Sequence, residues 1–344
     1  MKVLLIGDTH FGASNSSDYF LKYQEKYFER LLKYMLDNDI HHMIHLGDLY
    51  DNRKSIDIRT LKMSTKFFTN AFNRDDMNVW IIIGNHDTVY KNTVELNTVR
   101  ELLYWTRFHI VDKPEDVMIG NASFLLVPWI CDSNIIECME AINNSPSEFC
   151  AGHFEIEGFQ YILGAKSTSG LNREVFSRFD TTFSGHYHAG SYANGIYYVG
   201  SPYELTWADY NDKKRVLVLD TETKKVQSVT SISKPVFYKI HKWNPDIDIE
   251  RYRNKIVKVH IDDTVDRYPF DKWFTQLMSA AYRATIVENS VILDETEEID
   301  VSMTKDTLHL LFEYVDSVYG QEDEATIEGI KRLVKSTYQE ACSL

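Results

Sequence analysis

The sequence has few cysteines, no long apolar run and a shortage of positive charge. Its four cysteines are not arranged as CxxC pairs or with zinc-site spacing, so we expect reduced thiols rather than disulfides or a structural zinc site. No stretch of about 18 apolar residues is present, and the N-terminal segment MKVLLIGDTH turns polar too early for a signal peptide. These absences predict a cytoplasmic protein with no membrane span.

The shortage of positive charge bears directly on which partners are expected. The 37 Lys and Arg residues face 51 Asp and Glu, giving a net charge of −14, which by itself argues against nucleic-acid binding. The acidity is uneven, however, because residues 294–344 hold 13 acidic and 4 basic side chains, a balance of −9. The first 293 residues therefore carry only −5, and the composition does not exclude action on a polyanion there.

Apolar runs alternate with helical patterns in the first half of the chain. Strands are predicted at 2–6, 42–46 and 79–83, and helices at 20–38 and 58–72. This β–α–β–α–β order predicts a parallel sheet covered by helices. Further strands are predicted at 122–130, 148–153, 181–184, 196–199, 216–220 and 226–231, the last two as a hairpin. We therefore expect an α/β fold over residues 1–235, in which two sheets form a sandwich flanked by helices.

The remaining chain has a different composition. Residues 236–292 predict a small α+β capping domain that could bind DNA, with strands at 256–261 and 284–287 and a helix at 270–282. Residues 293–303 are acidic and lack helical periodicity, which is typical of a linker. Residues 304–344 predict two amphipathic helices that could bind a partner, although packing on the same domain and disorder were the alternatives. Their apolar positions are Leu308, Leu311, Phe312, Val315, Ile327, Ile330 and Val334.

Five clusters of polar residues each follow a predicted strand. They are Gly7-Asp8-Thr9-His10, Gly47-Asp48-Leu49-Tyr50-Asp51, Gly84-Asn85-His86-Asp87, Gly152-His153 and Gly185-His186-Tyr187-His188. Sites in α/β sheets form at the carboxyl ends of strands, so these clusters are expected to converge. Carboxylate, imidazole and amide ligands without thiolates suit Mn²⁺, Fe²⁺ or Zn²⁺, and one carboxylate can bridge two such ions. The sequence thus predicts a dinuclear metal site suited to phosphoryl transfer.

These five motifs, in this order, resemble the calcineurin-like metallophosphoesterase superfamily over residues 1–235. The Gly-Asp-Leu-Tyr-Asp-Asn-Arg element, the Gly-Ser-Pro at 200–202 and the C-terminal additions narrow the resemblance to the SbcD / Mre-eleven-type DNA repair nucleases, including the recombination endonuclease subunits of T-even-like phages. The resemblance implies two divalent ions, Mn²⁺ with Mg²⁺ as the alternative. The implied metal ligands are Asp8, His10, Asp48, Asn85, His153, His186 and His188, with Asp48 bridging.

The same resemblance implies roles for two further residues. His86 would protonate the leaving oxygen or stabilise the charged transition state, and Asp87 would orient His86. Asp51 departs from the pattern, because some cellular members have a histidine there that is tied to exonuclease action. Which nuclease mode dominates, 3′-to-5′ exonuclease or single-strand endonuclease, is therefore left open.

Other residues were weighed against plainer interpretations. Arg53, Lys54 and Arg59 could hold the DNA backbone, or could simply lie on an exposed helix face. Packing was favoured for Trp129, Tyr203 and Trp207 over a role at the site rim, and His41, His42 and His45 were interpreted as surface or strand-packed histidines.

The resemblance further implies a homodimer, DNA as substrate and an SMC-like coiled-coil ATPase of the SbcC type as partner, all in the host cell cytoplasm if the protein is phage-encoded. Two alternatives remain at this point: a phosphatase or phosphodiesterase acting on a small molecule or phosphoprotein, and a non-catalytic scaffold of the same fold.

Overall fold

The structure is a computed structural model of the chain. It describes residues 1–162, 164–262 and 264–288, and in addition residues 315, 327, 329–331 and 334. Residues 1–288 form one compact unit, and residues 289–344 form a second one. No helix in the described part of the chain is long and apolar enough to cross a membrane.

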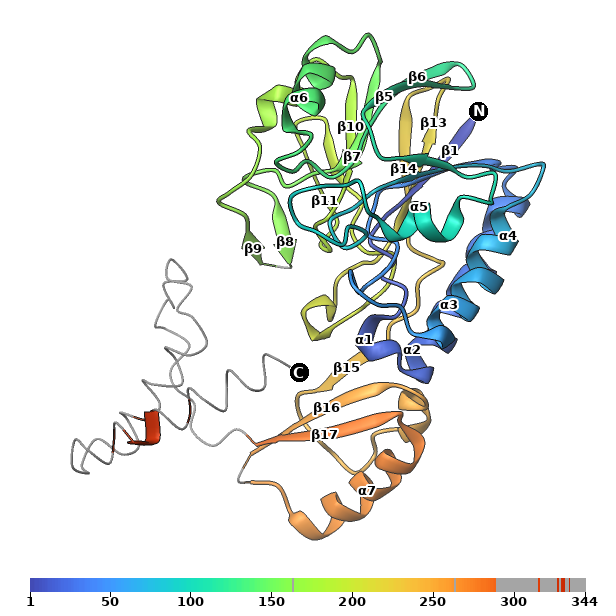
Figure 1. The fold of residues 1–344 in the computed structure, drawn as a ribbon. Coiled ribbons are helices and arrows are strands. Elements are labelled where there is room, and N and C mark those ends of the chain that lie inside the picture. The colour runs from blue at the N-terminus through green and yellow to red at the C-terminus, as the bar shows by residue number, and fades with distance from the viewer. Residues whose placement is uncertain are drawn as a thin grey trace. The chain divides into compact units, whose positions relative to one another are not determined.

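The first sheet of the unit 1–288 is six-stranded and mixed, and most of its strands come from the first 111 residues (Figure 1). Its strands, in spatial order, are β14 (Lys225–Val229), β13 (Val216–Asp220), β1 (Lys2–Ile6), β2 (His42–His45), β3 (Asn78–Ile82) and β4 (His109–Val111). The strands from β1 to β4 are parallel, and β13 and β14 form the antiparallel hairpin that the sequence predicts. The edge strand β4 was not predicted.

A second six-stranded mixed sheet packs against the first. Its strands, in spatial order, are β11 (Ser191–Ala193), β12 (Ile196–Tyr198), β10 (Thr181–Gly185), β7 (Phe149–His153), β6 (Ala122–Val127) and β5 (Glu115–Ile119). Strand β7 lies parallel to β6 and to β10, while β5 and β11 pair antiparallel at the two edges. A shared apolar layer joins the two sheets and includes Val3, Leu5, Ile44, Ile82, Phe124, Phe149, Phe183 and Leu217. The two-sheet arrangement therefore agrees with the sequence prediction.

Helix α2 (Asp18–Asp37) covers the outer face of the first sheet. Ser17 caps its N-terminus, because the Ser17 side chain accepts a hydrogen bond from the backbone N–H of Phe20. Its buried residues recur every three or four positions and include Phe20, Gln24, Tyr27, Phe28, Leu31 and Met35. The predicted helical face is confirmed except at Tyr23, which is only half-buried.

The predicted helix at 58–72 is present but changes its winding. Helix α3 (Ile58–Ser64) leads through a π-helical turn at Thr65–Thr69 into α4 (Asn70–Phe72). A π-turn adds a residue to the helical repeat and so shifts the buried face. As a result Met63, Phe68 and Phe72 are buried, whereas Leu61 and Phe67 are half-buried.

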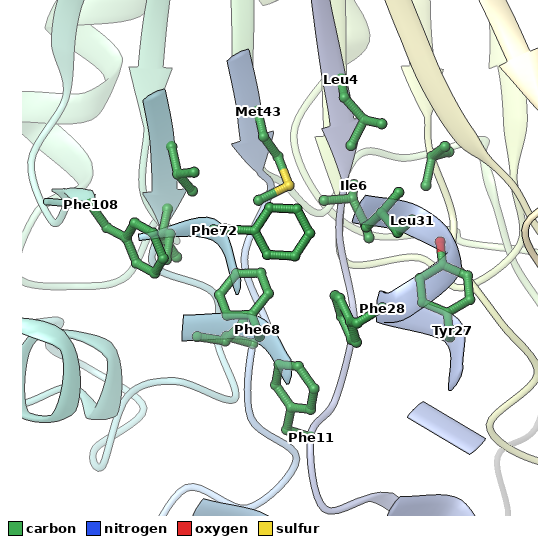
Figure 2. Packing of buried hydrophobic residues seen from close by; sticks show 14 of the residues in the cluster. Leu4, Ile6, Phe11, Tyr27, Phe28, Leu31, Met43, Phe68, Phe72 and Phe108 are labelled. Carbon is green, nitrogen blue, oxygen red and sulfur yellow. The ribbon is translucent and has the colours of Figure 1, made fainter. Parts of the chain in front are cut away.

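Aromatic side chains fill the space between the first sheet and its helices (Figure 2). Phe68 lies at the centre, with ring centroids 5.6 Å from Phe11, 5.4 Å from Phe28 and 5.5 Å from Phe72. Leu4, Ile6 and Met43 contribute from the sheet side of the same cluster. This packing fixes the loop that begins at residue 7, because Phe11 anchors it in the core directly after the first predicted ligands.

The last part of the unit 1–288 is a three-stranded parallel sheet with one long helix. Strands β15 (Phe237–Ile240), β16 (Ile256–Ile261) and β17 (Arg283–Glu288) pair in that order, and α7 (Arg267–Ala280) connects the last two. Phe270, Trp273, Phe274 and Leu277 bury the apolar face of α7 against this sheet. The strands and helix expected here are present, and β15 is an additional strand.

Shorter elements complete the described chain. They are α1 (Ala13–Ser16), α5 (Thr98–Leu103), α6 (Ile135–Asn144), the strand pair β8 (Gln160–Ile162) and β9 (Ala165–Lys166), and 3-10 turns at Arg173–Phe176, Trp207–Asp209 and Ile249–Tyr252. Of the expected C-terminal helical pair, Val315, Ile327, Ile330 and Val334 are described and helical. The expected linker 293–303 and the residues Leu308, Leu311 and Phe312 lie outside the described residues. The predicted domain boundaries stay a prediction.

Candidate metal centre

Five strand ends bring the polar clusters of the sequence together. Strands β1, β2 and β3 lead into the clusters at 8–10, 48–51 and 85–87, while β7 ends at His153 and β10 ends just before His186. Their parallel pairing within each sheet places these ends at one edge of that sheet. The convergence predicted from sequence is therefore present.

The backbone at this edge is strained at the candidate ligands themselves. Asp8, His10, Asp48 and His186 all have positive φ, at 53°, 43°, 54° and 87°. L-residues rarely adopt this conformation, and it persists only where surrounding contacts enforce it, typically at functional sites. Here the contacts are hydrogen bonds from the Asp8 N–H to the Gly47 carbonyl (3.0 Å) and from the His10 N–H to the Asp48 carbonyl (3.1 Å).

Two glycines permit this close packing. A Cβ on Gly84 would overlap both the backbone nitrogen and a carboxylate oxygen of Asp48. A Cβ on Gly47, whose φ is +94°, would overlap the ring of His153. The glycines before the candidate ligands are therefore needed because the neighbouring side chains approach the bare backbone.

Asp8, His10 and His188 form the first ligand group. One ligand atom from each lies within 4.8 Å of the others, and the Nε2 atoms of His10 and His188 are 3.1 Å apart. The Asp8 carboxylate also accepts a hydrogen bond from the His186 N–H, at 2.9 Å to Oδ1. Two imidazole nitrogens that face each other so closely can share at most one hydrogen, whereas both can donate a lone pair to one cation.

Asp48, His153 and His186 form the second ligand group, with Asn85 between the two histidines. The Asn85 Oδ1 atom lies 2.8 Å from Nε2 of His153 and 2.9 Å from Nδ1 of His186. The other ring nitrogen of His153, Nδ1, lies 2.7 Å from the Leu46 carbonyl oxygen. This second contact places the hydrogen on Nδ1 and leaves Nε2 free as a ligand atom.

The Asp48 carboxylate reaches both groups. Its Oδ2 atom lies 3.4 Å from Nε2 of His153 and 3.7 Å from Nε2 of His10. Its Oδ1 atom accepts a hydrogen bond of 2.7 Å from the backbone N–H of His86. Asp48 is therefore placed to bridge two cations, as the resemblance implies.

The protonation of these buried groups follows from burial and from their mutual charges. Burial raises the pKa of Asp8 to about 7, and the nearby charge of Asp48 acts in the same direction. Burial would also raise the pKa of Asp48, but His153, His10 and His86 together hold that pKa well below its usual range. Two buried carboxylates so close together call for positive charge between them.

The histidines divide into two classes. Burial lowers the pKa of His186 and of His188 to about 3, so both rings are neutral at physiological pH. Burial would lower the pKa of His153 too, but the charge of Asp48 outweighs it and raises that pKa to about 9. Neutral imidazoles are ready-made ligands, while His153 must release a proton to bind a cation.

The donor set fits a pair of divalent cations. It combines carboxylate oxygens, imidazole nitrogens and one amide oxygen, and no thiolate lies in the described ligand groups. Without bound cations, there is no evident reason for two histidine nitrogens to face each other in a buried site, or for the Asp48 carboxylate to lie between the two groups.

His86 lies beside the two ligand groups described above but belongs to neither of them. Its Nδ1 atom is 2.7 Å from the backbone carbonyl oxygen of Asp51, which directs Nε2 away from that carbonyl. The His86 ring meets the ring of His10 edge-on, with centroids 4.9 Å apart. The side chain is half-buried, so its free nitrogen is available to a substrate at the metal groups.

We expected Asp87 to contact and orient His86, and the structure corrects this expectation. The Asp87 carboxylate instead accepts hydrogen bonds from the backbone N–H groups of Leu49 (3.0 Å), Tyr50 (3.2 Å) and Gly84 (2.9 Å). It therefore ties the loop after β2 to the loop after β3. The Asp87 carboxylate is buried, and it satisfies three backbone N–H groups that would otherwise lack an acceptor. The His86 ring is oriented instead by the backbone carbonyl of Asp51.

Asp51 forms a further group with His10 and His86. Its Oδ1 atom lies 3.2 Å from Nδ1 of His10, while its side chain remains 40% exposed. The carboxylate thus faces the ring nitrogen of His10 that does not point toward His188.

Trp129 lies beside the second ligand group, although core packing was predicted for it from the sequence. Its ring centroid lies 5.1 Å from that of His186 and 5.9 Å from that of His153, and the side chain is half-buried. The prediction of core packing was wrong for Trp129 but correct for Tyr203, which is fully buried. The one available signal was its position at the end of an apolar strand, like the ligand clusters.

Two other groups of candidates fall outside the metal centre. Arg59 is paired with Asp57 at 3.0 Å and with Asp18 at 3.1 Å, so its charge is already neutralised. Arg53 is half-buried and Lys54 is exposed. His45 is buried and its Nε2 lies 3.0 Å from Thr9 Oγ1, which confirms the interpretation of a strand-packed histidine.

Comparison with known proteins agrees with this centre. Residues 1–190 match the family described as calcineurin-like phosphoesterase. The protein named exonuclease subunit 1 of Enterobacteria phage T4 is 28% identical over 341 residues, which cover 97% of this chain and 98% of that protein. A protein of Invertebrate iridescent virus 3 that is named a phosphoesterase is 26% identical over 210 residues, covering 58% of this chain and 57% of that protein.

A search of solved structures found a chain from a study of an archaeal phosphodiesterase. It is 14% identical, with a TM-score of 0.33, and the match covers 67% of this chain and 99% of that one.

Proposed function

Because this chain belongs to the calcineurin-like phosphoesterase family, we propose that it is a two-metal DNA nuclease that acts as a 3′-to-5′ exonuclease and single-strand endonuclease. The single observation that carries the two-metal part is Asp48, whose carboxylate lies within 3.7 Å of a histidine from each ligand group. The similarity to a phage exonuclease subunit over nearly the full length of both chains supports the nuclease part.

In this proposal the two ligand groups hold one divalent cation each. Asp8, His10 and His188 would hold the first, Asn85, His153 and His186 the second, and Asp48 would bridge them. Manganese is the expected ion, with magnesium as the alternative, because hard oxygen donors are mixed with imidazoles. When bound, such ions supply Lewis-acid activation of water and of a phosphodiester.

The protein's own groups prepare the site for this chemistry. The Asp51 carbonyl holds His86 so that Nε2 can face a phosphodiester lying at the ligand groups. From there His86 can donate a proton to the leaving oxygen or hydrogen-bond to the charged phosphoryl oxygens. Asp87 acts indirectly, by holding the two loops that carry Asp48 and His86 at a fixed separation.

The partners implied by the resemblance are also part of the proposal. We expect an SMC-like coiled-coil ATPase to bind the segment 304–344, and a second copy of the chain to form a homodimer in the host cytoplasm. The T4 relative is itself named as a subunit, which supports a multi-subunit nuclease.

The test compares three substrates at fixed Mn²⁺: short single-stranded DNA, bis-p-nitrophenyl phosphate and p-nitrophenyl phosphate. We expect hydrolysis of the DNA and of the diester, with little turnover of the monoester. Rapid monoester turnover without DNA cleavage would overturn the nuclease proposal in favour of a phosphatase. No turnover of any of the three would favour a non-catalytic scaffold.

A further inference from the structure

A groove beside helix α2 concentrates positive charge in a chain whose net charge is −14. The groove measures about 580 Å³ and runs between α2 and the segments that flank β15, β16 and β17. Six cationic side chains line it: Lys22, Lys26, Arg30, Lys234, Arg253 and Lys255. We call this feature the basic groove.

The charge of the basic groove is largely uncompensated. Its only acidic lining residue, Asp18, is already paired with Arg59 at 3.1 Å. Arg253 is paired with Glu250. In the described part of the chain, no ion pair involves Lys22, Lys26, Lys234 or Lys255. Four lysines thus face a common hollow without an ion-pair partner among the described residues.

The cations on α2 form a stripe. Lys22, Lys26 and Arg30 are spaced by four residues, so they share one side of the helix. Apart from Asp18, the acidic residues of the same helix do not line the groove, and Glu25 lines another hollow next to Lys62 and Lys66. A stripe spaced at about one helical turn suits the regularly spaced charges of a phosphate backbone.

The connection between β14 and β15 fixes the groove in place. The Tyr23 hydroxyl donates to the Lys234 carbonyl (2.6 Å), Arg30 Nε to the Ile232 carbonyl (2.8 Å) and Lys255 Nζ to the Pro235 carbonyl (2.6 Å). A second guanidinium nitrogen of Arg30, Nη2, is buried without a hydrogen-bond partner among the described residues. Burial lowers the pKa of Lys255. The charge of Glu204 acts against this shift, and the charges of Arg30 and Lys234 add to it. The groove is therefore preformed and would gain from a bound anion.

Aromatic rings adjoin the cations. Tyr19 stacks on Tyr282 with centroids 4.0 Å apart and an interplanar angle of 14°, and Tyr282 is 44% exposed. Tyr282 also borders a second hollow of about 380 Å³, which is lined by Ser14 and Asn15 in the loop that follows His10. The basic groove thus continues past an exposed ring toward the chain segment that carries a candidate metal ligand.

We propose that the basic groove binds the phosphate backbone of a single DNA strand and holds it beside the metal centre. The pairing of uncompensated cations with exposed aromatic rings is the chemistry by which proteins bind single-stranded nucleic acid. This inference rests on the proposed function, because a strand held here would be the substrate of that centre. It also explains how an acidic chain could hold DNA, and it assigns this role to residues other than the neutralised Arg59.

The test removes two lysines whose side chains form no hydrogen bond or ion pair with the described residues. Lys22→Gln/Lys26→Gln takes two exposed charges from the groove, and Lys113→Gln/Lys225→Gln takes two exposed charges from elsewhere as a matched control. Binding of a fluorescent single-stranded oligonucleotide is measured by anisotropy with EDTA over a salt series. We expect the groove variant to bind roughly tenfold more weakly at about 100 mM salt, and the slope of log K against log salt to fall by about 1.4.

The outcomes separate this inference from the proposed function. Equal affinity and slope for wild type and groove variant would overturn the basic groove, whatever the activity. Loss of binding to a poly-glutamate peptide with DNA affinity retained would also overturn it, by assigning the groove to an acidic protein segment. Hydrolysis of bis-p-nitrophenyl phosphate with Mn²⁺, which does not depend on the groove, should be unchanged in the variant. If wild type binds DNA through the groove but hydrolyses neither DNA nor this diester, the proposed function fails and the groove stands.

Discussion

The Oδ1 atom of Asp51 lies 3.2 Å from Nδ1 of His10, on the side of the ring opposite His188. The negative charge of a carboxylate in this position favours the tautomer with its hydrogen on Nδ1, which leaves Nε2 as the ligand atom. The relationship gives Asp51 a positioning role for which a positive charge is not required. It therefore offers a physical reason for an aspartate at this position.

The first prediction concerns this contact. Asp51→Ala should weaken Mn²⁺ binding by roughly 10- to 100-fold, because His10 loses the charge that favours its ligating tautomer. Isothermal titration with Mn²⁺ measures the effect directly. Asp39→Ala is the control, because Asp39 pairs with His41 at an exposed position away from the ligand groups. Unchanged Mn²⁺ affinity in Asp51→Ala would remove the positioning role.

The second prediction concerns pH and the metal-free protein. The pKa of His153 is raised to about 9, above its ordinary value of 6.5, so protonated His153 stabilises the fold below pH 6.5 and this stabilisation is lost as pH rises toward 9. With EDTA, the free energy of unfolding should therefore fall between pH 7 and 8.5. Denaturant titrations at several pH values measure it.

The control for that experiment is His153→Gln. This variant lacks the titrating ring and should show a flatter pH dependence over the same range. Bound Mn²⁺ should reverse the trend, because cation binding requires the deprotonated ring and so strengthens with pH. A metal-free wild type whose stability rises between pH 7 and 8.5 would contradict the assigned ionisation of His153.

The third prediction uses Trp129 as a reporter of the second ligand group. Its ring lies 5.1 Å from His186, so a paramagnetic Mn²⁺ ion at that group should quench its fluorescence. Titration of wild type with Mn²⁺ should quench part of the tryptophan emission, and Trp129→Phe should lose most of that response. Equal quenching in both proteins would place the ion elsewhere.

The fourth prediction concerns the C-terminal segment. Deletion of residues 304–344 should abolish co-purification with the ATPase subunit but preserve Mn²⁺-dependent cleavage of short DNA. The described residues Val315, Ile327, Ile330 and Val334 are helical and apolar, as a partner-binding helix requires. Full retention of the ATPase by the truncated chain would refute the assignment.

The convergence of the candidate ligands could be predicted from the sequence because their signal is local. A glycine followed by Asp, Asn or His directly after an apolar strand marks a strand end, and topology then brings these ends together, as for Asp8, Asp48 and His153. The same locality explains the success with β1, β2 and β3, whose apolar runs are short and bounded by polar residues.

The failures concern contacts between distant segments. Nothing near Asp87 in the sequence indicates that the amides of Leu49 and Tyr50 need an acceptor, so its contact with His86 was wrongly expected. Trp129 resembles a core residue until His186, more than fifty positions later, is seen beside it. The π-turn at Thr65–Thr69 depends on how Phe68 packs among other rings, which helical periodicity does not reveal.

The central claim is that His86 serves a metal-dependent nuclease centre, and one comparison tests it most directly. Wild type and His86→Ser are assayed for cleavage of a short single-stranded DNA in Mn²⁺, with Mn²⁺ binding measured on both proteins. We expect wild type to cleave the DNA. We expect the variant to bind Mn²⁺ normally but to lose at least about 100-fold in cleavage rate, the lower range for a general acid. Equal cleavage by the two proteins would contradict it.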